Sequence, residues 1–268
     1  MSTGFTISSA ANQNPLEYGD SHRLFMQSML SHRILPLEKA HELYFKICDL
    51  TQFNIAIKKF FFLIGERVEF DDFYNAINAE IGEIDLALRT TNDERDGSTL
   101  LGLVNAKEDE IAQIATKYTP NEITFFREML ETIITADDEK NAISSMVALR
   151  LGQKMKPQLS QKDTQALIDR FTEDGWICLT PDGSSYAIDT RSIMELNSYF
   201  REQYGDMIKE CMMCYDIVTM GERCELQNCG VRMHRHCADS QFAGGNLTCP
   251  SCKTSWSRSN TFGLGLPL

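Results

Sequence analysis

The stretch "CELQNCGVRMHRHC", residues 224–237, places three cysteines and two histidines within fourteen residues. Seven of the nine cysteines of the chain lie between Cys211 and Cys252. Together with one histidine they form the series Cys211-x2-Cys214-x9-Cys224-x4-Cys229-x4-His234-x2-Cys237-x11-Cys249-x2-Cys252. These eight residues make four close pairs, which is the number of ligands that two tetrahedral zinc ions need. We therefore expect two zinc sites, and the alternative is a redox-active or fortuitous cysteine cluster.

The spacing alone does not decide which pairs share a metal. The interleaved arrangement of RING and PHD modules would give the first zinc Cys211, Cys214, His234 and Cys237, and the second zinc Cys224, Cys229, Cys249 and Cys252. We expect His234 to be the ligand because it precedes Cys237 by three residues. His236 is adjacent to Cys237, where a shared metal would strain the backbone, so it should lie beside the site or on the surface. Since protein ligands fill all four positions, both sites would be structural.

The composition of the chain disfavours several classes of function. The chain has 268 residues and a formal net charge of −12, which disfavours tight autonomous DNA binding because phosphate backbones repel acidic surfaces. The first twenty residues are polar and lack the basic start and apolar stretch of a secretory signal. The densest apolar run, residues 60–64, is too short to cross a membrane. We expect a soluble cytosolic or nuclear protein, whose reducing environment disfavours disulfides.

Upstream of the cysteines the chain is mainly α-helical with small β-hairpins. Apolar periodicity and capping residues predict helices over 21–34, 36–50 and 70–84, then a hairpin over 85–105. A similar order follows, with helices over 108–118, 119–136, 141–152 and 160–175, a hairpin over 176–188 and a helix over 189–206. Three helices and a two-stranded wing are typical of a winged helix. We interpret the pattern as two winged helices in tandem; the alternative is one irregular helical domain with two hairpins.

The third helix of a winged helix often enters a DNA groove, so its charge matters. The segment 70–85 carries acidic residues and no Lys or Arg, and acids outnumber bases over 160–175. Neither helix presents a basic face, so we expect these units to bind proteins or each other and not to read DNA. The expected domains are a disordered lead over 1–17, winged helices over 18–105 and 106–206, a variant RING finger over 207–257 and a flexible tail over 258–268.

Several segments together resemble one family. "CGVRMHRHC" at 229–237, "CPSC" at 249–252, "SHRLFMQSMLSHRIL" at 21–35 and the two winged-helix patterns are similar to the non-SMC element one family, the variant-RING subunit of the SMC five/six complex. The resemblance extends from about residue 20 to residue 256. The gap of four residues between Cys224 and Cys229 is wider than in the family pattern, so the resemblance does not predict the structure of the loop between them.

The resemblance implies a set of partners and an activity. Such subunits pair with a MAGE-type subunit and a kleisin-like subunit, in a nuclear, chromosome-associated complex that acts in DNA repair and recombination. The RING is expected to be a weak, partner-dependent ubiquitin E3 ligase. Such a ligase holds a ubiquitin-charged E2 enzyme in position and performs no bond chemistry itself.

RING fingers in general suggest where an E2 would bind. Met213 would be an apolar contact, Phe242 the aromatic of a shallow groove, Pro250 a further contact and Lys253 a basic contact to E2 and ubiquitin. Alternatively, Met213 and Phe242 cover the zinc core and Lys253 is solvated. A different class of function is a non-catalytic scaffold whose PHD-like zinc module docks a partner or a histone tail. Leu247 stands where PHD fingers usually carry an aromatic, which favours RING.

Overall fold

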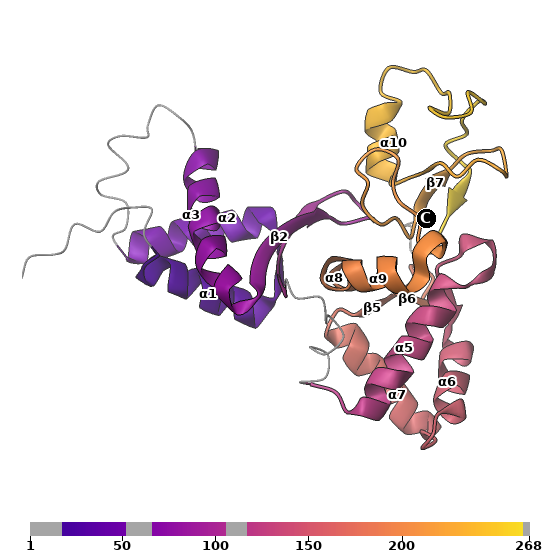
Figure 1. Cartoon of the computed structure of the whole chain (residues 1–268), viewed down its shortest axis with the longest axis horizontal. Helices are drawn as coiled ribbons and strands as arrows, with labels where there is room; N and C mark the ends of the chain where they lie inside the picture. Colours follow the sequence, from indigo (N-terminus) through magenta and orange to yellow (C-terminus); the bar gives the residue numbers. More distant parts are fainter. Residues whose placement is uncertain (1–17, 52–65, 106–116, 265–268) are drawn as a thin grey trace, which may run out of the picture.

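The computed structural model describes residues 18–51, 66–105 and 117–264. Figure 1 shows three units in chain order, from indigo through orange to yellow, and each has a three-stranded antiparallel sheet. The fold is mainly helical with small sheets, which confirms the expected fold class. The expected lead over 1–17 and most of the helix expected over 108–118 lie outside the described ranges. No helix within these ranges is long and apolar enough to cross a membrane.

The first unit is a winged helix. Its elements are α1 (Asp20–His32), β1 (Ile34–Pro36), α2 (Leu37–Leu50), α3 (Glu66–Ile81), a short 3-10 turn (Gly82–Ile84), β2 (Leu86–Asn92) and β3 (Thr99–Asn105). The sheet order is β1-β3-β2. Phe25 and Met29 on α1 and Ile77 on α3 are fully buried, in agreement with helical spacing on one face of each helix. The hairpin β2–β3 is the wing of this unit.

The second unit repeats this order. Its elements are α5 (Pro120–Ile134), the 3-10 turn η2 (Asp137–Glu139), β4 (Ala142–Ser144), α6 (Ser145–Lys154), α7 (Gln161–Glu173), β5 (Ile177–Leu179), β6 (Ser185–Ile188), α8 (Thr190–Glu195), α9 (Asn197–Tyr204) and the 3-10 turn η3 (Gly205–Met207). The sheet order is β4-β6-β5. Phe125, Phe126 and Phe171 are fully buried where α5 meets α7. The tandem winged-helix interpretation is therefore confirmed.

Three local expectations were wrong. The strands β1 and β4 were not expected, because three residues are too few to show an alternating pattern. The helix expected from residue 141 begins at Ser145, since the Ser144 side chain accepts a hydrogen bond from the Val147 amide and caps α6 there. The helix expected over 189–206 is two helices, because the backbone at the fully buried Leu196 leaves helical geometry (φ −112°, ψ 22°).

The third unit holds the clustered cysteines. It contains β7 (Gly221–Arg223), β8 (Arg232–Met233), α10 (Arg235–Gln241) and β9 (Thr261–Phe262), with sheet order β8-β7-β9. The flexible tail expected from residue 258 is wrong for 258–264. Phe262 is buried and its strand pairs with β7, and the Gly263 amide donates to the Glu139 carbonyl in the second winged helix. Burial of one aromatic and backbone pairing hold this segment in place.

One buried histidine gives the first winged helix a pH dependence. His22 on α1 is fully buried against the ring of Phe73, at 4.3 Å between ring centroids, and its Nδ1 accepts a hydrogen bond from the Gly19 amide. Burial disfavours the charged imidazolium and lowers the pKa of His22 to about 4. The unfolded chain regains an ordinary pKa near 6.5 and then binds more protons than the folded chain between these two values.

We predict that the contribution of His22 to the free energy of unfolding is fully present above pH ~6.5 and is lost as the pH drops towards ~4. At about pH 5 the wild type should have lost about 2 kcal/mol through this histidine, because 1 pKa unit corresponds to about 1.4 kcal/mol. His22→Phe should not show this loss. Urea unfolding at about pH 7 and about pH 5 measures this difference. The exposed His32→Gln change on the same helix is the control, and equal pH slopes for His22→Phe and the wild type would contradict the prediction.

Candidate metal centres and their contacts with the winged helices

The structure gathers the eight predicted ligands into two groups. Cys211, Cys214, His234 and Cys237 form one group, and Cys224, Cys229, Cys249 and Cys252 form the other. Within each group the ligand atoms lie within 4.8 Å of one another, and none of the nine cysteines, all of which lie in the described ranges, forms a disulfide. The grouping is the interleaved one, so segment 224–237 supplies ligands to both groups.

The distances suit a tetrahedral metal. In the first group, Nδ1 of His234 lies 3.3 Å from Sγ of Cys214 and 3.9 Å from Sγ of Cys237. In the second, the Cys224–Cys252 and Cys229–Cys249 sulfur pairs are 3.5 and 3.8 Å apart. Thiolates bound at ~2.3 Å to one tetrahedral zinc would be about 3.8 Å apart. Both groups therefore fit zinc, and neither leaves a position for water or substrate.

Two similar turns position the Cys-x2-Cys pairs. The Tyr215 amide donates to the Cys211 carbonyl and the Lys253 amide donates to the Cys249 carbonyl. Tyr215 and Lys253, each directly after the second cysteine of its pair, both have φ of 63°. A left-handed conformation costs energy in residues other than glycine, so the surrounding contacts must hold these turns.

The start of α10 explains why His234 and not His236 joins the first group. His234 is the N-cap residue of α10 and Cys237 lies one turn further, so both side chains lie on the same face. Nε2 of His234 points away from the sulfurs, towards the Ile217 carbonyl at 3.1 Å. The His236 ring instead stacks on His234, with centroids 5.1 Å apart and an interplanar angle of 8°.

The thiols differ in their tendency to ionise. Burial raises the pKa of Cys211, but hydrogen bonds from His234 and backbone amides outweigh it and lower that pKa to about 6. The Thr254 hydroxyl lowers the pKa of Cys252 to about 6. Burial raises the pKa of Cys224 and Cys237 to about 12. Because zinc binds thiolates, loading each group must release protons, and acid should weaken binding.

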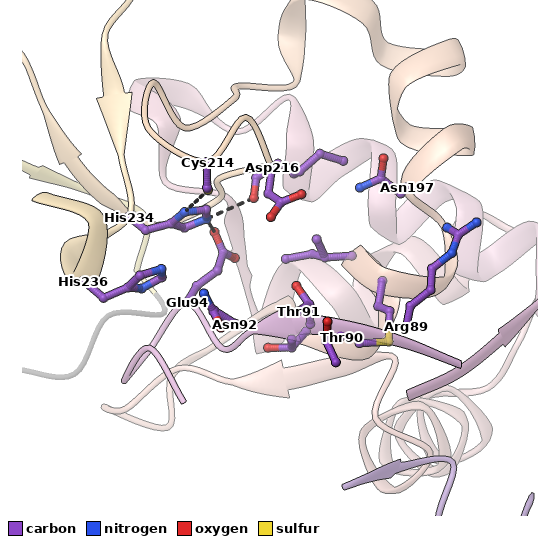
Figure 2. A pocket seen from close by; sticks show the side chains of 14 residues that line it. Arg89, Thr90, Thr91, Asn92, Glu94, Asn197, Cys214, Asp216, His234 and His236 are labelled. Carbon is purple, nitrogen blue, oxygen red and sulfur yellow. Dashed lines mark hydrogen bonds and ion pairs between the residues drawn. The ribbon is translucent and has the colours of Figure 1, made fainter. Parts of the chain in front are cut away.

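The wing of the first winged helix reaches the first group. Glu94, at the turn between β2 and β3, lies beside His234 (Figure 2). Both residues line a cavity of about 210 Å³, together with Thr190, Ile193 and Met194 of α8. Glu94 is buried, and its carboxylate accepts hydrogen bonds from the amide and the hydroxyl of Thr219, both at 2.7 Å. One Glu94 oxygen also lies 3.2 Å from Nε2 of His234. The wing therefore contacts a predicted metal ligand.

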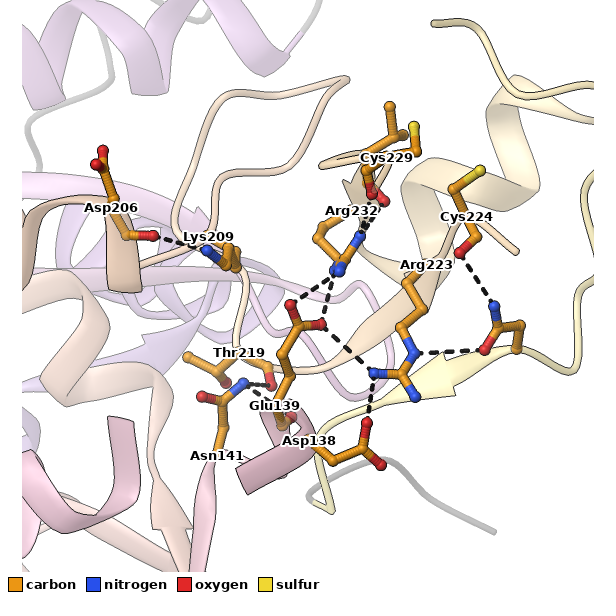
Figure 3. Close-up of polar contacts among 12 residues, drawn as sticks. Asp138, Glu139, Asn141, Asp206, Lys209, Thr219, Arg223, Cys224, Cys229 and Arg232 are labelled. Carbon is orange, nitrogen blue, oxygen red and sulfur yellow. Dashed lines mark hydrogen bonds and ion pairs between the residues drawn. The ribbon is translucent and has the colours of Figure 1, made fainter. Parts of the chain in front are cut away.

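The second winged helix contacts the same unit from another direction. Glu139 in η2 receives two hydrogen bonds from the guanidinium of Arg232, at 2.7 and 2.8 Å, and Arg232 also donates to the Cys229 carbonyl (Figure 3). Asn141 donates to the Thr219 carbonyl at 2.7 Å. Bidentate pairing between Arg and a carboxylate is strong and directional. Thr219 thus joins both winged helices to the cysteine-rich unit.

The four expected E2 contacts are in different environments. Met213 is 41% exposed, Pro250 is half-buried and Lys253 is exposed, with its Nζ donating to the Pro250 carbonyl. Phe242 is only 5% exposed and packs on Trp256, with ring centroids 5.3 Å apart. The Phe242 ring therefore covers the core of the unit, which is the alternative role considered for it, and offers little surface to a partner.

Glu94, Thr219, Glu139 and Arg232 were not identified from sequence. The turn 93–98 is polar, and polar turns are usually exposed, yet Asp93 and Glu94 are buried. The burial of Glu94 comes from its contact with Thr219, which lies 125 residues later, and single-sequence periodicity carries no such information.

Comparisons with known proteins agree with this architecture. Residues 22–196 match the family described as "Nse1 non-SMC component of SMC5-6 complex", and residues 211–252 match a RING-like domain. The chain is 30% identical to the non-structural maintenance of chromosomes element 1 homolog of Xenopus laevis over 88% of this chain and 83% of the relative. The human homolog is 28% identical over 88% of this chain and 84% of its own.

A more distant relative and a solved structure extend the match. The Schizosaccharomyces pombe non-structural maintenance of chromosomes element 1 is 26% identical over 74% of this chain and 82% of its own. A chain from a solved Nse1-Nse3-Nse4 complex superposes with a TM-score of 0.76 at 29% identity, covering 90% of this chain and 97% of that chain. The chain therefore belongs to the Nse1 family, the non-SMC component of the SMC5-6 complex, and carries a RING-like domain at its C-terminal end.

Proposed function

We propose that this chain is a RING-type E3 ubiquitin ligase subunit of an SMC5-6 complex, with two structural zinc ions in its RING-like domain. The observation that carries the proposal is the pair of closed four-ligand groups within a RING-like fold, next to an exposed apolar side chain on the first ligand loop. Zinc would be bound by Cys211, Cys214, His234 and Cys237 at one site, and by Cys224, Cys229, Cys249 and Cys252 at the other.

Zinc would supply folding energy here. The apolar cluster of this unit has eleven buried residues, of which four are ligand cysteines, three are aromatic and four are aliphatic, so the hydrophobic core apart from the ligands is small. Modules of this kind fold when the metal binds, because the binding free energy is also folding free energy. Closed coordination leaves the metal no part in hydrolysis.

The two neighbouring histidines offer a matched test of the zinc assignment. We expect the wild-type chain to hold two zinc ions and His236→Ala to retain both. His234→Ala should hold fewer than two and lose structure in the RING-like domain, since one imidazole ligand is gone. Metal analysis of the purified variants, together with circular dichroism, measures this. Loss of zinc on replacing His236 but not His234 would show the ligand assignment to be wrong.

The ligase would act by positioning an E2 enzyme charged with ubiquitin. Met213, Pro250 and Lys253 would contact the E2, while Phe242 would support the groove from beneath. Met212 and Tyr215, on the same loop as Met213, are 42% and 68% exposed and enlarge the apolar surface available to a partner. Holding the thioester in a reactive orientation accelerates transfer without a catalytic side chain.

Burial of Phe242 favours a second candidate function. Without an accessible aromatic in the groove, the module would be a non-catalytic scaffold, similar to a PHD finger, that docks a partner or a histone tail. Both candidates use the same zinc sites, so only an activity measurement separates them.

The partners would be proteins of the SMC5-6 complex. The solved relative was found with Nse3 and Nse4, which fits the expected MAGE-type and kleisin-like subunits. The winged helices would bind these partners, in the nucleus and on chromosomes, during DNA repair and recombination. Little autonomous DNA binding is expected. Helix α3 carries one Arg against five acidic residues, and Arg170 on α7 pairs with Glu122 at 2.7 Å.

We predict that the chain with its MAGE-type partner accelerates discharge of ubiquitin from a charged E2. Met213→Ala should slow discharge about fivefold or more, because truncating an interface anchor commonly costs more than about 1 kcal/mol. Met207→Ala is the matched control, since Met207 is 50% exposed but lies in η3, before residues 211–252, which match the RING-like domain. Absence of discharge by the wild type, with and without the partner, would exclude the ligase and leave the scaffold.

A further inference from the structure

The contact between Glu94 and His234 joins two distant parts of the chain. Glu94 belongs to the wing of the first winged helix, and His234 to the first predicted metal site. Both side chains are about 95% buried, and Glu94 Oε1 lies 3.2 Å from His234 Nε2. A buried carboxylate is costly unless polar partners satisfy it, and here two hydrogen bonds from Thr219 and the contact with His234 Nε2 do so.

The two nitrogens of His234 have different partners. Nδ1 faces the sulfurs of Cys214 and Cys237, whereas Nε2 faces Glu94 and the Ile217 carbonyl. An imidazole that binds a metal through Nδ1 carries its proton on Nε2 and needs an acceptor there. Histidine ligands of zinc almost always donate this proton to a carboxylate or a carbonyl, which fixes the ring and makes it a stronger ligand.

We propose that Glu94 is a positioning residue for the first zinc site, donated by the wing of a different domain. The proposal rests on the zinc binding proposed above. Glu94 holds the Nε2–H tautomer of His234 and orients the ring, so docking of the wing strengthens zinc binding. By thermodynamic reciprocity, zinc at this site also strengthens docking of the wing.

The geometry of the wing supports this role. Arg95 pairs with Asp93 at 2.7 Å and with Asp189 of the second winged helix at 3.1 Å, which secures the turn on both sides of Glu94. Gly97 has φ of +75°, and a Cβ atom there would lie 2.8 Å from Cβ of His236. The wing backbone therefore rests directly against the histidine that stacks on His234.

The test compares zinc release from Glu94→Ala, Glu94→Gln and the wild-type chain. With excess chelator, the first site of Glu94→Ala should lose zinc about 10- to 100-fold faster, the range typical for loss of such a partner. Release from the second site should be unchanged. Cobalt substitution distinguishes the sites, since three thiolates with one imidazole absorb differently from four thiolates. Glu94→Gln keeps one carbonyl oxygen and should fall between Glu94→Ala and the wild type.

Arg95→Ala is the control for general loosening of the wing, because it removes the ion pairs on either side and leaves the Glu94 carboxylate in place. It should accelerate release less than Glu94→Ala. In the zinc-loaded wild type, NMR should show a His234 Nε2–H proton that exchanges slowly with water, and this needs no variant to fold.

The outcomes separate this inference from the proposed function. A wild-type chain that binds fewer than two zinc ions refutes the zinc sites themselves. Three results would overturn the role of Glu94 in a chain that binds two zinc ions. Zinc could leave the wild type and Glu94→Ala at equal rates, or Arg95→Ala and Glu94→Ala could accelerate release equally. The third result is a His234 Nε2 that carries no proton. Should Glu94→Ala not fold, the rate of zinc release from Glu94→Gln decides: a rate equal to that of the wild type would overturn the role of Glu94.

Discussion

The hydrogen bonds around Thr219 are the constraint on which the arrangement of the three units depends. The Thr219 amide and hydroxyl donate to Glu94 of the first winged helix, and its carbonyl accepts from Asn141 of the second. Glu94 is buried by this contact, so separation of the units would leave the threonine groups without these partners and return the carboxylate to water. A buried charged network of this kind stabilises one arrangement over others only when every member is satisfied.

Each winged helix also contacts one of the two cysteine groups. Glu94 contacts His234 of the first group, and Glu139 holds Arg232, which donates to the backbone of Cys229 in the second. Three non-glycine residues in and beside η2 have a positive φ: Asp138 at 58°, Glu139 at 53° and Asn141 at 47°. This turn contacts the RING-like domain through Glu139 and Asn141. Such strain persists only where contacts compensate for it. These contacts give the RING-like domain a defined orientation relative to the two winged helices.

Much of this organisation could be predicted from the sequence, and the reasons are local. The Cys-x2-Cys pairs and the three-residue step from His234 to Cys237 follow from turn and helix geometry, so the two groups could be anticipated. The long helices could be predicted from the periodic spacing of their apolar residues. The strands β1 and β4 could not be predicted because they are short, and their pairing partners lie far along the chain. The role of Glu94 could not be predicted either, because a buried acid in a polar turn has the same sequence as an exposed one.

The tail after Arg258 also shows that local sequence does not predict long-range packing. This tail is glycine-rich, which predicts flexibility, yet Phe262 packs beside Arg232 and its strand completes the sheet. Long-range packing, not local propensity, decides such segments.

Hydrogen exchange in the wing tests the central claim, that the metal sites and the docking of the winged helices are coupled, most directly. The amides of Asp93 and Gly97 are hydrogen-bonded within the turn, to Ser98 and Asp93. Exchange at residues 93–98 should be slow in the zinc-loaded chain and become faster when a chelator removes zinc, although no predicted metal ligand lies in the wing. Unchanged exchange in the wing, alongside faster exchange in the RING-like domain, would contradict the account.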